Sequence, residues 1–116
     1  MSTDSTAHLR VVRAEARYEI WDDELGAEPT MAGFAQFETS GDAIKIVHTE
    51  IDNAFRGRGY AQVLAERSLA DIIARDEVLW PLCPFYAKHL TTHLVEGLRV
   101  HWPFGQPVGA ATPNTD

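Results

Sequence analysis

The feature that most constrains the fold is a change in the spacing of apolar residues between residues 43 and 83. Residues 43–51 alternate between two faces, which is typical of a β-strand. From residue 59 to about 75 the apolar residues follow the i, i+3, i+4, i+7 spacing of an amphipathic helix, and residues 78–83 form a short apolar run typical of a buried strand. This order predicts a βαβ crossover over residues 43–82, and therefore two parallel strands.

The remaining elements surround this crossover. Residues 9–21 suggest extended structure, and the acidic stretch 22–29 is prone to turns. A strand over 31–38 is expected to pair with 43–51 through turn residues 39–42, and Pro84 can begin a second helix. We therefore predict an α+β fold with a mixed, mostly antiparallel sheet, a βαβ crossover and two main helices. Three alternating apolar residues add a final strand or form an apolar patch for a partner: Val100, Trp102 and Phe104.

The length of 116 residues fits one domain, and 45% hydrophobic with 23% charged residues is close to the globular average. Both ends are rich in small and polar residues that bury little apolar surface. We expect flexible ends over 1–8 and 105–116 and a single domain over 9–104.

The formal net charge of −7 argues against nucleic acid as a partner, because binding a phosphate backbone needs a basic surface. No apolar run is long enough to span a membrane, and residues 1–8 lack the apolar core of a signal peptide. The one cysteine, Cys83, has no internal disulfide partner. We expect a cytoplasmic protein with no membrane partner, present as a monomer or weak homodimer.

The strongest local motif is the loop Arg56-Gly57-Arg58-Gly59-Tyr60-Ala61, between the strand 43–51 and the helix. Two glycines allow a tight turn and a close approach to a ligand, and the N–H groups at a helix N-terminus favour an anion. Such a loop can hold a phosphate. It can equally be an ordinary strand-to-helix turn with solvated arginines.

This loop matches the Arg/Gln-x-x-Gly-x-Gly/Ala motif of the GNAT superfamily of acetyl-CoA-dependent N-acetyltransferases. The chain resembles most closely a minimal single-domain subfamily, through His48-Thr49-Glu50, the Arg-Gly-x-Gly loop and Pro81-Leu82-Cys83-Pro84-Phe85. The resemblance covers roughly residues 18–93. It departs from full-length members before Met31, where the chain is too short and acidic for the usual pair of helices that help to form the acceptor site.

The resemblance implies a GNAT-like fold and acetyl-CoA as cosubstrate. The pantetheine arm would lie in a cleft where the parallel strands separate, near Ile51 and Leu82. The loop amides would hold the pyrophosphate, so the cofactor-binding residues expected from the resemblance are Ile51, Arg56, Gly57, Arg58, Gly59, Tyr60 and Ala61.

Acyl transfer to an amine sets its own requirement, since an ammonium group must lose a proton before it attacks a thioester. Glu50 and His48 are candidate bases, because strict alternation puts them on one strand face, together with Ile44 and Ile46. The alternative is a solvated carboxylate and a half-buried histidine. Cys83 is expected to protonate the departing thiolate, to accept the acetyl group itself, or simply to fill space in the core.

Tyr86 and His89 are three residues apart on the second helix, and the resemblance makes either one a candidate acid. His89 and His93 have the i, i+4 spacing of a zinc-ligand pair, but further ligands are scarce, so no metal is expected. We predict direct transfer of an acetyl group to a primary amine. The alternative is a non-catalytic acyl-CoA-binding or interaction module.

Overall fold

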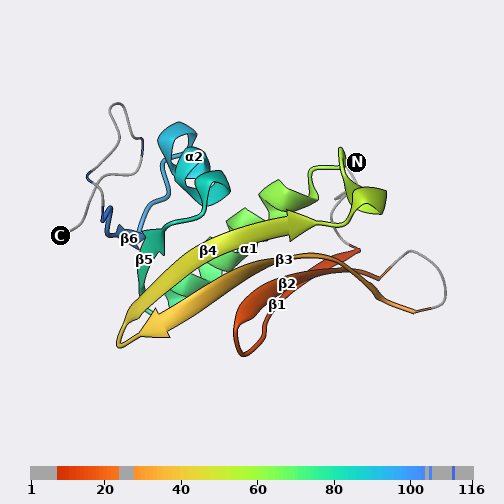
Figure 1. The fold of residues 1–116 in the computed structure, drawn as a ribbon, viewed down its shortest axis with the longest axis horizontal. Coiled ribbons are helices and arrows are strands. Elements are labelled where there is room, and N and C mark those ends of the chain that lie inside the picture. The colour runs from red at the N-terminus through yellow and green to blue at the C-terminus, as the bar shows by residue number, and fades with distance from the viewer. Residues whose placement is uncertain (1–7, 24–27, 104, 106–110, 112–116) are drawn as a thin grey trace.

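The computed structural model describes residues 8–23, 28–103, 105 and 111. Six strands form one sheet in the order β1-β2-β3-β4-β5-β6, which is strongly twisted (Figure 1). The elements in chain order are β1 (Leu9–Arg13), β2 (Arg17–Asp22), β3 (Thr30–Ser40), β4 (Ala43–Ile51), the short 3₁₀ helix η1 (Asn53–Phe55), α1 (Tyr60–Ala74), β5 (Val78–Pro81), α2 (Pro84–Thr92) and β6 (Arg99–Val100).

Strand pairing confirms the predicted fold class. β1 to β4 pair antiparallel with their neighbours, whereas β4–β5 and β5–β6 are parallel. The parallel β4–β5 pair with α1 between them is the predicted βαβ crossover. The extended region 9–21 divides into two strands, and the hairpin turn between β3 and β4 narrows to Gly41 and Asp42, with Gly41 at a φ of 61°. The expected flexible ends lie outside the described residues, apart from His8, Gly105 and Ala111.

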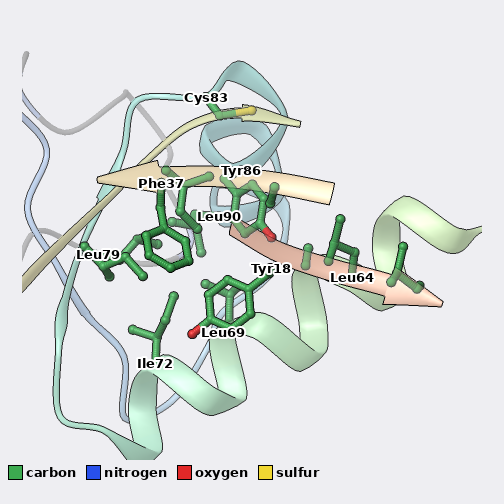
Figure 2. Close-up of a cluster of buried hydrophobic side chains, with 14 of the residues drawn as sticks. Tyr18, Phe37, Leu64, Leu69, Ile72, Leu79, Cys83, Tyr86 and Leu90 are labelled. Atoms are coloured by element: carbon green, nitrogen blue, oxygen red, sulfur yellow. The ribbon is translucent and has the colours of Figure 1, made fainter. Parts of the chain in front are cut away.

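Both helices pack on the same side of the sheet. α1 packs against β1–β4, α2 packs against β4 and β5, and the Tyr86 and Ser68 hydroxyls join the two helices at 2.7 Å. The buried face of α1 carries the predicted apolar stripe, including Leu64, Leu69 and Ile72. Figure 2 shows these side chains meeting Tyr18 and others from the sheet in one core. Burial of this stripe stabilises α1 against the sheet.

The end of the chain contributes to this core. β6 is only two residues long, and Val100 and Trp102 are both buried. Of the two expectations for this region, the final strand is therefore the one observed, in shortened form. Phe104 lies outside the described residues.

One expectation about β4 was wrong. Gln36 of β3 pairs with His48, but the next residue, Phe37, pairs with Ile46, so Val47 is an extra residue in β4. Such a bulge reverses the alternation of side chains beyond it. Ile44 and Ile46 are buried, whereas His48 and Glu50 are exposed and lie on the opposite face.

Candidate functional site

The loop between β4 and α1 forms a pocket of about 320 Å³. Gly57 and Gly59 have φ angles of 81° and 80°, a backbone conformation that glycine adopts without strain. Gly59 is the N-cap of α1 and offers no side-chain cap, so the first N–H groups of the helix face the loop uncapped. The pocket is lined by all the expected cofactor-binding residues except Arg58, together with Phe55: Ile51, Phe55, Arg56, Gly57, Gly59, Tyr60 and Ala61.

Tyr60, the first residue of α1, is held in place by contacts of its hydroxyl group and its ring. The Tyr60 hydroxyl donates to Asp22 Oδ2 at 2.6 Å, and its ring stacks on Phe55 with centroids 5.5 Å apart. Burial is the main cause of a raised pKa for Tyr60, and Asp22 adds to it. His8 Nε2 lies 3.3 Å from the same hydroxyl. The sequence analysis missed Asp22, because only pairing with β1 and β3 places this residue of an acidic stretch in the interior.

Positive charge gathers around this pocket although the chain is acidic. Most cations that the structure describes are paired or bonded, for example Arg13 with Glu77 at 2.7 Å. Within residues 8–23 and 28–103, Arg56, Arg58 and Lys88 make no ion pair with a carboxylate. Arg56 Nε instead donates to the Ile51 carbonyl oxygen at 3.3 Å, and Arg58 lies over the Phe55 ring. Two guanidinium groups with no carboxylate partner among the described residues therefore border the pocket.

β4 and β5 separate after a short paired stretch. The two strands pair only as far as Ile46 and Pro81, after which the Cys83 N–H donates to the Ile46 carbonyl oxygen at 2.7 Å. β4 continues to Ile51 with its β5 side unpaired in the described part of the chain, which leaves backbone groups for a ligand. Leu82 and Phe85, which follow β5 in the chain, are large apolar residues that are each 36% exposed.

Cys83 lies where β4 and β5 stop pairing. It is 3% exposed, and its Sγ lies 3.2 Å from Thr49 Oγ1, within hydrogen-bond distance. Figure 2 shows it at the edge of the core, beside the start of α2. The bulge at Val47 turns Thr49 toward Cys83, so this contact was not predictable from strict alternation.

His48 and Glu50 form a pair on the open face of the sheet. Their Nε2 and Oε2 atoms are 3.2 Å apart, and their side chains are 53% and 60% exposed. An ion pair this exposed contributes little to stability, so packing does not explain it. Glu50 also lines a small pocket of about 100 Å³ with Asp52, Met31, Ala32, Gly33 and Phe34.

The candidate residues of α2 lie apart from this pair. Tyr86 is fully buried, its hydroxyl contacts Ser68, and burial raises the pKa of Tyr86 far above its usual value. His89 is also buried and its ring stacks on His93 with centroids 4.1 Å apart. Burial and then His93 lower the pKa of His89. No contact among the described residues joins His89 to His48 or Glu50.

Two other features are absent from the described residues. No helix has the length and hydropathy needed to cross a membrane. No group of three or more His, Cys, Asp or Glu side chains is arranged to hold a metal ion.

The mixed sheet, the crossover helix with an uncapped glycine-rich start and the early separation of the parallel strands β4 and β5 define a protein of the GNAT-like fold class. A family model described as GCN5-related N-acetyl-transferase matches residues 17–96. The chain therefore belongs to the GCN5-related N-acetyltransferase family, a family of acyl-transferring enzymes. A search of curated proteins found no match.

Proposed function

We propose that this protein transfers the acetyl group of acetyl-CoA directly to a primary amine. The observation that carries the proposal is the pocket of about 320 Å³ at the start of α1. It combines an uncapped helix N-terminus, two glycines with positive φ and bordering arginines, and no carboxylate lines it. A pyrophosphate, which is anionic and accepts several hydrogen bonds, suits this set of donors and charges.

The fit extends along β4. Pantetheine carries two amide groups on an alkyl chain, and the unpaired edge of residues 47–51 offers backbone donors and acceptors of the matching kind. Leu82 and Phe85, exposed just after β5, supply apolar surface for the alkyl chain. We assign Ile51, Gly57, Gly59, Ala61 and the two arginines to cosubstrate binding, with Tyr60 positioned by Asp22.

The acceptor amine is assigned to the open face of the sheet. The Glu50 and Asp52 carboxylates attract an ammonium group to the small pocket that they line, and Phe34 and Met31 offer apolar walls to its alkyl chain. Glu50 and Ile51 are adjacent on β4 but line different pockets. The strand therefore separates an acceptor side from a cosubstrate side.

Glu50 then takes a proton from the ammonium group, with His48 3.2 Å away to stabilise or relay it. The amine nitrogen forms a bond to the acetyl carbonyl carbon, the carbon–sulfur bond breaks, and the sulfur leaves as a thiolate that takes up a proton. The Cys83 thiol is assigned to proton donation where β4 and β5 stop pairing and not to carrying the acetyl group.

Thermal unfolding with and without saturating acetyl-CoA tests the binding step. A ligand at 100 times its Kd stabilises the native state by about 2.7 kcal/mol, which corresponds to a rise in Tm of several degrees for a domain of this size. Desulfo-CoA should act similarly and ATP only weakly. No shift at millimolar acetyl-CoA would overturn the proposal.

Release of free thiol with a panel of primary amines tests the transfer step. Glu50→Gln and His48→Ala should each lower kcat by about 10²- to 10⁴-fold, the usual contribution of a positioned base. Glu38→Gln is the matched control, because Glu38 is an exposed carboxylate on the neighbouring strand. It should leave the rate unchanged.

A non-catalytic acyl-CoA-binding module is the second candidate. The exposure of His48 and Glu50 favours it, as does the region before β3, whose described residues form strands and not the usual acceptor-site helices of full-length members. Acetyl-CoA binding without turnover for any amine would support this second candidate.

Kinetic order separates direct transfer from an acetyl-cysteine route. Direct transfer gives intersecting lines when initial rates are measured at several concentrations of both substrates. Parallel lines, together with an acetyl group on Cys83 detected by mass spectrometry, would establish the other route.

A further inference from the structure

A second pocket, of about 250 Å³, lies in the groove between α1 and α2. Its lining begins one residue along α1 from that of the loop pocket, since Ala61 lines the loop pocket and Gln62 lines the groove. Both residues belong to the first turn of α1. The groove is lined by Gln62, Phe85, Lys88, His89, Thr92 and His93.

Lys88 is the only lysine or arginine in this lining, and burial lowers the pKa of His89. The Lys88 side chain is exposed and makes no ion pair with a carboxylate in the described part of the chain. The sequence contains one other lysine, Lys45, whose ammonium group lies 4.7 Å from the centroid of the Trp80 ring. Lys45 neighbours Glu38 on the face of the sheet opposite the helices.

We propose that Lys88 binds the 3′-phosphate of coenzyme A in this groove. The inference rests on the proposed function, which assigns the pyrophosphate to the start of α1. In coenzyme A the 3′-phosphate is attached to the ribose next to the pyrophosphate, so a groove whose lining begins one residue along α1 from that of the loop pocket is suitably placed for it. An ammonium group with three donors suits a phosphate dianion, and the Gln62 amide can add a neutral donor.

Nearby carboxylates repel a phosphate from one end of the groove and leave the end that holds Lys88. Glu66 is one turn further along α1, accepts a hydrogen bond from Gln62 at 3.2 Å, and lines an adjoining pocket of about 490 Å³ with Glu96. Two carboxylates would repel a phosphate from that pocket. The end that holds Lys88 and Thr92 has no carboxylate in its lining.

The test compares coenzyme A with dephospho-coenzyme A, which lacks only the 3′-phosphate, by titration calorimetry. Wild-type protein should bind coenzyme A about tenfold more tightly, the usual effect of one charge-assisted contact at an exposed site. Lys88→Ala should lose this preference, because the variant should bind coenzyme A more weakly and dephospho-coenzyme A as tightly as the wild type does. Lys45→Ala, which removes the same charge from the other face, should keep it.

The outcomes separate this inference from the function on which it rests. If the wild type binds both ligands with equal affinity, or if Lys88→Ala keeps the preference, the assignment of Lys88 is wrong and the loop pocket stands. If the wild type binds neither ligand, the proposed function is wrong and the assignment of Lys88 falls with it. The Tm of each variant without ligand shows that it folds, and the exposure of Lys88 predicts no change.

Discussion

Gly59 combines a positive φ of 80° with open space, because a Cβ built there meets no protein atom within 4 Å. Gly41 in the β3–β4 turn has the same properties, with a φ of 61°. Alanine at either position costs about 1 kcal/mol of stability through backbone strain. Only at Gly59 does the added methyl group enter the loop pocket.

We therefore predict that Gly59→Ala weakens acetyl-CoA binding by tenfold or more, and that Gly59→Glu abolishes binding because a carboxylate also repels the pyrophosphate. Gly41→Ala should bind as the wild type does. The measurements are the Kd by calorimetry and the free energy of unfolding in urea. Equal binding by Gly59→Glu and the wild type would remove the phosphate assignment from this loop.

Of the three buried tyrosines, Tyr60 and Tyr86 differ in the charge of the group that their hydroxyl contacts. Tyr60 donates to the Asp22 carboxylate, which is 1% exposed, whereas Tyr86 contacts the neutral Ser68 hydroxyl. Hydrogen bonds to charged groups contribute about 1.5–3 kcal/mol, and neutral ones about 0.5–1.5 kcal/mol.

Tyr60→Phe should therefore destabilise the protein more than Tyr86→Phe, with losses near the middle of those two ranges. Urea unfolding measures both losses. The reverse order would show that Asp22 is satisfied by its other partners and that Tyr60 does not anchor the start of α1.

At the scale of elements, α2 carries a histidine whose protonation opposes folding. Burial and His93 lower the pKa of His89, although Glu66 acts in the opposite direction. The unfolded chain has the ordinary histidine pKa of about 6.5, so it takes up a proton at a higher pH than the folded protein does. The stability contributed by neutral His89 is therefore fully present above the pKa of the unfolded chain, and it decreases as the pH falls below that value toward the pKa of the folded protein.

We predict that the free energy of unfolding falls more steeply between about pH 7 and pH 5 in the wild type than in His89→Gln. Urea titrations at several pH values measure the slope, and the difference at pH 8 gives the packing cost of the substitution. Equal slopes would mean that His89 takes up its proton as readily in the folded protein as in the unfolded chain.

The elements themselves were predicted well where their signal is local. The strand over 43–51 has the predicted bounds, and the helix expected over 59–75 is observed as Tyr60–Ala74. These predictions rest on the spacing of apolar residues and on residues that favour turns, and both signals depend only on neighbours in the sequence. β3 is longer than expected, and β5 is shorter, because partner strands determine where pairing stops.

At the scale of the whole molecule, net charge and local charge oppose each other. The chain has a net charge of −7, which repels an anionic ligand, yet Arg56, Arg58 and Lys88 make no described ion pair with a carboxylate. Salt at physiological concentration screens charges that are more than about 8–10 Å apart. Whether added salt weakens or strengthens coenzyme A binding therefore shows whether the nearby cations or the net negative charge has the larger effect on affinity.

We predict that coenzyme A binds more weakly as salt rises from about 0.05 to 0.5 M, because the nearby cations outweigh the distant net charge. The double variant Arg56→Ala, Arg58→Ala should reduce this salt dependence, and Lys45→Ala should leave it unchanged. Calorimetry at four or five salt concentrations measures the slope. Tighter binding at high salt would mean that the net charge dominates.

The sequence by itself determined the βαβ crossover, the glycine loop and the family resemblance. These follow from residues close together in the chain: an alternating strand, two glycines and a helical stripe over 59–75. The loop residues then line one pocket because they are nearly contiguous in the chain, so forming α1 brings them together.

Only the tertiary structure decided which way the β4 side chains face and which residues support the site. The extra residue Val47 exists only in the register of β4 against β3, and it separates His48 and Glu50 from Ile46. Asp22 meets Tyr60, 38 residues away, and Thr49 meets Cys83, 34 residues away. Such contacts arise from the pairing and packing of distant segments, and no local pattern in the sequence encodes them.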